Sequence, residues 1–123
     1  MNKDKIKLTI PNKPDYISLA RLTTSGIGSS MALDIDDIED IKVSIGEACI
    51  NSLISSAKDI DISFEIDEEK LSIDVSNVVE EISDELDEKK ERNLGLLIIK
   101  SLMDEVTFSE EGIKMIKYIE GGA

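Results

Sequence analysis

Two neighbouring segments alternate polar and apolar residues, and they constrain the fold of this chain more than any other feature of its sequence. Residues 60–66 (IDISFEI) and 71–79 (LSIDVSNVV) both follow the period of a strand that buries one face. The four residues between them, DEEK, are polar and have the length of a hairpin turn. An antiparallel pair of strands is therefore expected in the middle of the chain.

Other patterns place helices and further strands around this pair. Strands are expected where short alternating segments are bounded by proline or a turn, at residues 5–10, 106–110 and 113–119. Helices are expected where apolar residues recur every three or four positions, at residues 14–30, 34–57 and 93–106. One face of the third helix carries Leu94, Leu97, Ile98, Ser101 and Leu102. The order β-α-α-β-β-α-β-β predicts an α/β sandwich, a mixed and mostly antiparallel sheet with about three helices on one face.

The segment before the third helix is strongly charged. Residues 80–92 (EEISDELDEKKER) carry seven acidic and three basic residues, and Leu86 is their only strongly apolar residue after Ile82. So few apolar residues cannot form a buried element. The segment is expected to be an exposed loop or a solvated helix.

Length and charge limit the functions open to the chain. Its 123 residues fit one domain, which we place at residues 1–123. A net charge of −13 repels nucleic acid and anionic lipid. The longest apolar run, at residues 94–99, is too short to span a membrane, and a single cysteine fits a reducing compartment. We therefore expect a cytoplasmic protein that contacts neither nucleic acid nor a membrane directly.

Any chemistry must use carboxylates, amides, hydroxyls or a nucleotide, because the sequence contains no histidine. Glu47 and Asn51 stand four residues apart within the second expected helix and therefore share one face. An amide oxygen can ligate Mg²⁺ while a carboxylate one turn away orients a water or hydroxyl nucleophile. Because many solvent-facing helices carry the same pair, the spacing alone leaves a catalytic and a solvated role open.

Three longer stretches, in this order and spacing, carry a family resemblance. They are KPDYISLARLTTSGI (13–27), DDIEDIKVSIGEACINSLISSAKD (36–59) and NLGLLIIKSLMDEV (93–106). Together they resemble three successive landmarks of the RsbW and SpoIIAB group of bacterial anti-sigma factors, which are serine kinases of the GHKL ATPase superfamily with a Bergerat-type fold. GEACIN is similar to the E-A-x-x-N box of that family, and LGLLIIKSLMDEV is similar to the segment that follows its ATP lid.

The resemblance implies a regulator of transcription. Such a protein sequesters an alternative sigma factor, in stress response or sporulation, and uses ATP and Mg²⁺ to phosphorylate a serine of an anti-anti-sigma factor of the STAS type. The resemblance also implies a homodimer. A nucleotide-blind anti-sigma protein that kept the partner surface is the alternative, and a GHKL-like domain of other regulatory use is a third possibility.

The resemblance also assigns roles to individual residues. Glu47 would activate the serine hydroxyl, and Asn51 would bind the cofactor by ligating Mg²⁺. Asn77 stands where the family has its adenine-reading aspartate. Leu94 and Gly95 would belong to the nucleotide site, with Gly95 letting the backbone approach the phosphates at the start of the third helix. Arg21 matches an arginine on the partner-binding face of the family.

Three departures from the family pattern affect the expected nucleotide site. Asn77 accepts hydrogen bonds but carries no charge, and Val79 replaces a glycine that lets adenine pack against the backbone. Residues 80–92 stand in for an ATP lid that is usually longer and rich in glycine, and their seven acids disfavour a triphosphate. These departures favour the nucleotide-blind alternative, whereas Glu47, Asn51 and Gly95 favour the kinase.

Overall fold

The computed structural model describes residues 3–80 and 93–119 in full, together with the backbone of residues 86–92. Its helices are η1 (Pro14–Tyr16), α1 (Ile17–Ser30), α2 (Ile35–Ser55) and α3 (Leu86–Leu102). Its strands are β1 (Asp4–Ile10), β2 (Ile60–Ile66), β3 (Lys70–Ser76), β4 (Glu105–Ser109) and β5 (Gly112–Tyr118). The element order is the predicted one, with η1 as a short 3-10 turn before α1.

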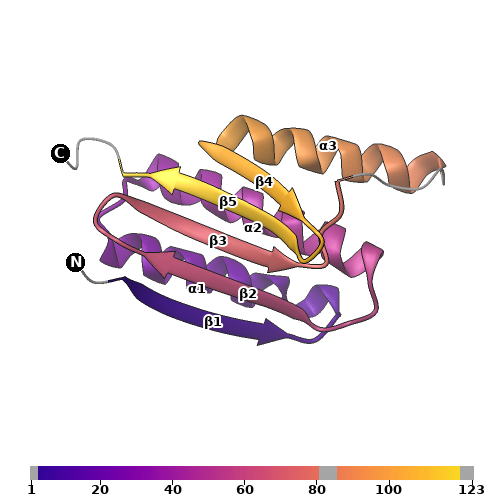
Figure 1. Cartoon of the computed structure of the whole chain (residues 1–123), viewed down its shortest axis with the longest axis horizontal. Helices are drawn as coiled ribbons and strands as arrows, with labels where there is room; N and C mark the ends of the chain where they lie inside the picture. The colour runs from indigo at the N-terminus through magenta and orange to yellow at the C-terminus, as the bar shows by residue number, and fades with distance from the viewer. Residues whose placement is uncertain (1–2, 81–85, 120–123) are drawn as a thin grey trace.

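The strands form one sheet in the order β1-β2-β3-β5-β4, and α1, α2 and α3 all cover the same face of it (Figure 1). Each pair of neighbouring strands in the described chain is antiparallel, so the sheet is not mixed. The predicted α/β sandwich with its helices on one face is confirmed. Within the described residues, none of the helices has the length and apolar character needed to cross a membrane.

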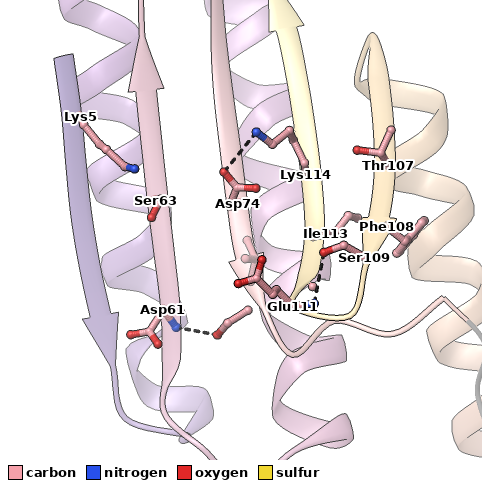
Figure 2. Close-up of a pocket in the computed structure, with 13 residues that line it drawn as sticks. Lys5, Asp61, Ser63, Asp74, Thr107, Phe108, Ser109, Glu111, Ile113 and Lys114 are labelled. Atoms are coloured by element: carbon pink, nitrogen blue, oxygen red, sulfur yellow. Dashed lines mark hydrogen bonds and ion pairs between the residues drawn. The ribbon is translucent and has the colours of Figure 1, made fainter. Parts of the chain in front are cut away.

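The face of the sheet opposite the helices is polar (Figure 2). Lys5, Ser63, Asp74 and Lys114 project from it, and Lys114 Nζ lies 3.8 Å from a carboxylate oxygen of Asp74. Burial raises the pKa of the Asp74 carboxyl above its ordinary value, and the charge of Lys114 opposes that rise. This face therefore carries mixed charges rather than a field of one sign.

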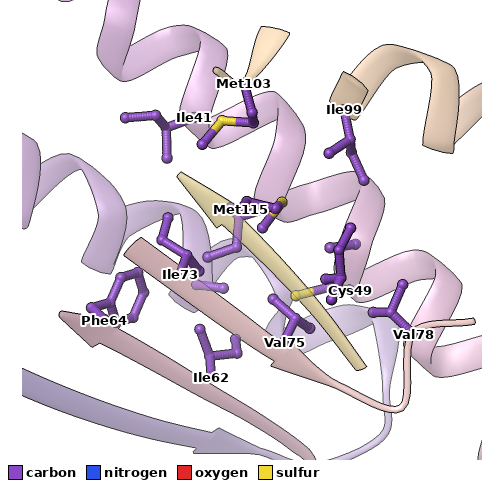
Figure 3. Close-up of a cluster of buried hydrophobic side chains, with 14 of the residues drawn as sticks. Ile41, Cys49, Ile62, Phe64, Ile73, Val75, Val78, Ile99, Met103 and Met115 are labelled. Carbon is purple, nitrogen blue, oxygen red and sulfur yellow. The ribbon is translucent and has the colours of Figure 1, made fainter. Parts of the chain in front are cut away.

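The hydrophobic core lies between the sheet and the helices (Figure 3). Phe64, Ile73 and Met115 stand side by side across β2, β3 and β5, and all three are fully buried. They lie beneath residues of α2 and α3 such as Ile41 and Ile99. Each such side chain contributes about 1.5–3 kcal/mol relative to an exposed position. The alternation seen in the sequence thus builds the inner face of the sheet.

Lys117 of β5 is a buried charged residue at the edge of this core, with 8% of its surface exposed. Its Nζ donates to the carbonyl oxygen of Leu102, the last residue of α3, at 2.7 Å. The same Nζ lies 3.6 Å from Asp40 and 3.8 Å from Asp37, both in α2. A carbonyl without a helical partner and two carboxylates thus compensate one buried ammonium. Lys117 therefore ties β5 to two helices.

The end of β3 differs from the prediction. The strand stops at Ser76 rather than at residue 79, because Asn77 has a φ of 62°. This left-handed conformation, which asparagine tolerates better than most residues, cannot continue a strand. Asn77, Val78 and Val79 therefore leave the sheet and cross toward the helical layer.

The third helix differs in its start and in its buried face. It begins at Leu86 rather than at residue 93, so the helical alternative holds for residues 86–92. The predicted apolar face is wrong, because Leu94 and Leu97 are 59% and 61% exposed. The buried residues of this stretch are instead Gly95, Leu96, Ile99 and Met103. In an almost wholly apolar run such as LGLLII, the helical period does not select one face.

Candidate functional site

α2 holds the predicted catalytic and metal-binding residues at the centre of the helical layer, between α1 and α3. The helix starts after Asp34, whose Oδ1 accepts a hydrogen bond from the backbone N–H of Asp37 at 2.8 Å. Glu47 is half-buried, and Asn51 is 3% exposed. Their spacing predicts a shared face, and the structure gives each side chain a different neighbour.

Glu47 lies against α3 at Gly95. A β-carbon placed on Gly95 would stand 2.7 Å from Oε1 of Glu47, which is closer than real side chains approach. Gly95 therefore leaves the space in which the carboxylate sits. The structure brings these two predicted site residues together, but through a contact between α2 and α3 that the sequence does not announce.

Asn51 is joined to the backbone that follows β3. Its Oδ1 accepts a hydrogen bond from Val79 N at 3.0 Å, and its Nδ2 donates to Val79 O at 3.0 Å. Ser55, one turn further along α2, donates from Oγ to the same Oδ1 at 2.9 Å. Because an amide oxygen has two lone pairs, both are occupied by these donors.

The segment 77–80 is held at three further points, and we call it the strap. The backbone N–H of Asn77 donates to the carbonyl oxygen of Glu111 in the turn between β4 and β5 at 2.9 Å. Val78 is 2% exposed and belongs to the hydrophobic core. Glu80 lies 3.5 Å from Lys100 of α3. The strap thus runs from the sheet across the end of α2 to α3.

Mg²⁺ and a nucleotide do not fit Asn51 in this arrangement. Ligation of Mg²⁺ requires a free oxygen lone pair, and both lone pairs of Asn51 Oδ1 are engaged by Val79 and Ser55. The described part of the chain also contains no group of three or more acidic or cysteine side chains that could hold a metal ion. Asn51, which the resemblance assigns to Mg²⁺, is instead hydrogen-bonded to the strap in this structure.

Leu94 and Gly95 do not stand at a helix N-terminus. α3 begins at Leu86, so both residues lie well inside the helix. The free backbone N–H groups that attract phosphate occur only in the first turn of a helix. The expectation that Gly95 stands at the start of the third helix is therefore wrong, and the Leu94 side chain is 59% exposed. The roles of both residues in nucleotide binding stay predictions.

Arg21 lies in the groove between α1 and α2 rather than fully in solvent. A β-carbon placed on Gly46 would have three guanidinium atoms of Arg21 as its nearest neighbours, with Nε at 2.9 Å and Cζ at 3.0 Å. Cys49, one turn further along α2, is fully buried. Burial raises the pKa of its thiol to about 12, and the positive charge of Arg21 acts in the opposite direction.

Two open cavities flank the strap and the sheet. A cavity of about 520 Å³ is lined by Ser55, Ser56, Asn77, Val79 and Phe108 among others. A second, of about 550 Å³, lies on the polar face of the sheet and contains none of the predicted site residues (Figure 2). Of the predicted site residues, Asn77, in the strap, lines the first of these two cavities.

Sequence reasoning missed the packing role of Gly46, and it named Val79 only as a departure from the family pattern and not as the partner of Asn51. Val79 contributes its backbone rather than its side chain, and no sequence pattern signals such a contact across 28 positions. Gly46 belongs to the GEACIN box, where the glycine before Glu47 was available as a sign of close helix packing.

The comparisons with known proteins agree with the fold. A match to the family described as histidine kinase-like ATPase domain spans residues 10–117. The serine-protein kinase RsbW of Staphylococcus aureus strain MSSA476 is 36% identical over 141 aligned positions, which cover 96% of this chain and 89% of that protein. The serine-protein kinase RsbW of Bacillus subtilis strain 168 is 30% identical over 142 positions, covering 98% and 89%.

The match to the histidine kinase-like ATPase domain covers most of the chain, and the observed sheet with its helices on one face is consistent with it. The chain belongs to that family. Within that family, the chain falls in the RsbW group, because it is 30–36% identical to the two RsbW proteins over nearly its whole length. The three stretches quoted from the sequence indicate the same group.

Proposed function

We propose that the chain is an anti-sigma factor of the RsbW type that binds and sequesters an alternative sigma factor in the cytoplasm. Relatives named serine-protein kinase RsbW cover 96% or more of the chain, which supports a regulator of the same kind. The anti-anti-sigma factor, a STAS-type protein, competes for this binding. The protein acts as a homodimer, as the resemblance implies.

The surface of α1 is the observation that carries this proposal. Leu19 and Leu22 are 45% and 67% exposed, and they flank Arg21 on the same helix. Adjacent apolar residues on a surface mark a site for another protein, and arginine is enriched at the energetic centres of interfaces. This combination suits a protein partner that offers an apolar patch and a carboxylate.

Phosphorylation of the anti-anti-sigma factor is the further step that the RsbW relationship implies. In that role Glu47 would accept the proton of the serine hydroxyl. The half-buried position of Glu47 beside Gly95 supports a held rather than a freely mobile carboxylate. ATP and Mg²⁺ are the cofactors of this step, and Asn51 could take part only after the strap has left it.

The nucleotide-blind alternative is favoured by specific observations. The strap occupies Asn51, and α3 runs without interruption through Gly95. The comparison with RsbW has more aligned positions (141) than this chain has residues (123), so the relative is longer within the matched region. A loss of residues between β3 and α3 would account for that difference and for a shortened lid over residues 80–92.

One set of titrations tests the proposal. Calorimetry with each purified alternative sigma factor of the host should find one that binds with micromolar or tighter affinity. Arg21→Ala should weaken that binding at least tenfold, whereas Lys13→Ala, which removes an exposed cation just before η1, should leave it within twofold. If no sigma factor binds the folded wild-type chain, the anti-sigma function is wrong. A parallel titration with Mg-ATP separates the kinase from the nucleotide-blind form.

A further inference from the structure

Arg21 is the only half-buried cation that α1 carries, and it lies in a groove between two helices. The chain has 27 acidic residues, yet every ion pair of the described residues is made by a lysine, and none is made by the Arg21 guanidinium. Guanidinium donors normally find acceptors when they are buried. The group is therefore held in place by packing rather than by a partner of opposite charge.

The packing surface is the backbone of α2 at Gly46. The three heavy atoms nearest to a β-carbon at that position all belong to the Arg21 guanidinium. Any side chain larger than hydrogen would force the guanidinium to shift from this position. Gly28, a buried glycine of α1, is different, because a β-carbon there would meet the side chain of Ile38.

We propose that Gly46 is a positioning residue, which holds the guanidinium of Arg21 in one orientation and leaves its N–H donors free for a carboxylate of a protein partner. This inference rests on the proposed function. Binding is stronger when the side chain that makes the contact is already ordered in the free protein. Gly46 immediately precedes Glu47, so the cation of the partner site and the carboxylate of the proposed chemistry are supported by consecutive residues of α2.

The first test needs no partner and uses the whole chain. Only two arginines are present, Arg21 and Arg92, so the Nε–Hε signals in a nitrogen-15 spectrum are assigned by one Arg21→Ala spectrum. The wild-type Arg21 signal should have a high order parameter, and in Gly46→Ala it should fall below about 0.6, the flexible range. The control is Gly26→Ala, since a β-carbon on Gly26 has nothing within 4 Å.

The second test measures binding of the sigma factor that the titrations identify. Gly46→Ala should weaken it about five- to tenfold while the thermal midpoint stays level or rises, because alanine favours a helix interior. Binding then weakens without any loss of thermal stability, which partial unfolding cannot produce. In a double-mutant cycle, Gly46→Ala should have no further effect once Arg21 is alanine.

Two results would overturn the inference. One is an Arg21 signal in Gly46→Ala that keeps the order parameter of the wild type. The other is full affinity of Gly46→Ala for a sigma factor that Arg21→Ala no longer binds. If no sigma factor binds the wild type, the proposed function fails, and the order parameter alone decides whether Gly46 positions Arg21.

Discussion

The two ends of α2 are both fixed to other elements, but by different chemistry. Near its start, Asp37 and Asp40 share the buried ammonium of Lys117, which also binds the end of α3. Near its end, Asn51 holds the strap through neutral hydrogen bonds to Val79. Removing one member of a buried charged group leaves the others uncompensated, whereas an amide can exchange one neutral partner for another. The contacts at the start of α2 are therefore suited to stabilising the fold. Those at its end are suited to releasing and rebinding the strap.

The largest expected effect tests the charged end. Lys117→Met removes an ammonium that has three partners and leaves Asp37, Asp40 and the Leu102 carbonyl without it. The free energy of unfolding should fall by about 3 kcal/mol. Urea denaturation measures this change.

Lys114→Met is the matched control, because Lys114 lies on the same strand but pairs with Asp74 on the open face, where its side chain is 43% exposed. It should cost less than about 1 kcal/mol. Equal losses in the two variants would show that the charged end of α2 is not specially dependent on Lys117.

Asn51→Ala should give the next largest effect. The substitution leaves the backbone N–H and C=O of Val79 without their partners at the edge of the core, and removes the acceptor of Ser55 Oγ. We expect a loss of about 2 kcal/mol in the free energy of unfolding. The exposed Asn93→Ala in α3 should stay within about 0.5 kcal/mol. If Asn51→Ala is equally mild, then Asn51 does not secure the strap.

Val79→Gly should favour release of the strap from Asn51 at the end of α2. Glycine raises the conformational entropy that is lost when the strap closes, and it removes a branched side chain. The affinity for Mg-ATP, measured by calorimetry, should rise at least fivefold, about 1 kcal/mol. Val79→Ala keeps most of the backbone restriction, so its affinity for Mg-ATP should rise less than that of Val79→Gly. An unchanged affinity in both variants would show that closure of the strap does not limit nucleotide binding.

The smallest expected effect concerns pH and lies outside both ends of α2. Burial raises the pKa of Asp74, so the folded state binds its proton more tightly than the unfolded state does. That contribution to stability is present at low pH and is lost as the pH rises through the raised pKa. Relative to Asp74→Asn, the wild type should therefore lose a few tenths of a kcal/mol between acid and neutral pH, since the group is partly exposed.

Asp67 gives the opposite case for comparison. Backbone N–H groups of Glu69 and then Lys70 lower the pKa of its carboxyl. The stability that this carboxylate provides should be present near neutral pH and lost as the pH falls through its lowered pKa. Acid titrations of Asp67→Asn and Asp74→Asn should therefore deviate from the wild type with opposite slopes. Slopes of the same sign would contradict the assigned causes.

The sequence predicted the fold well because its strands alternate. The register that places Phe64 beside Ile73 and Ile73 beside Met115 follows from burying one face of each segment. The start of α3 was open because residues 86–92 have high helix propensity but no apolar period. The end of β3 depends on one backbone angle at Asn77, which the alternation of LSIDVSNVV conceals.

The candidate site was predicted less completely, and the reason is physical. Spacing along α2 places Glu47 and Asn51 on one helix face, but it cannot show what packs against that face. Gly95 beside Glu47 and Val79 beside Asn51 are contacts between distant segments. They depend on how three elements meet, which local periodicity does not determine. The roles of Glu47, Asn51, Asn77, Leu94, Gly95 and Arg21 in function stay predictions.

The buried Cys49 can serve as a probe of how often the helical layer opens. Only a thiolate reacts rapidly with thiol reagents, and Cys49 is both shielded and, with a pKa of about 12, almost wholly protonated at neutral pH. No other thiol competes with it, because the chain has a single cysteine. The rate at which a thiol reagent labels Cys49 therefore reports how often α2 separates from the sheet. A ligand or partner that holds α2 against the sheet would lower the labelling rate without contacting the Cys49 sulfur.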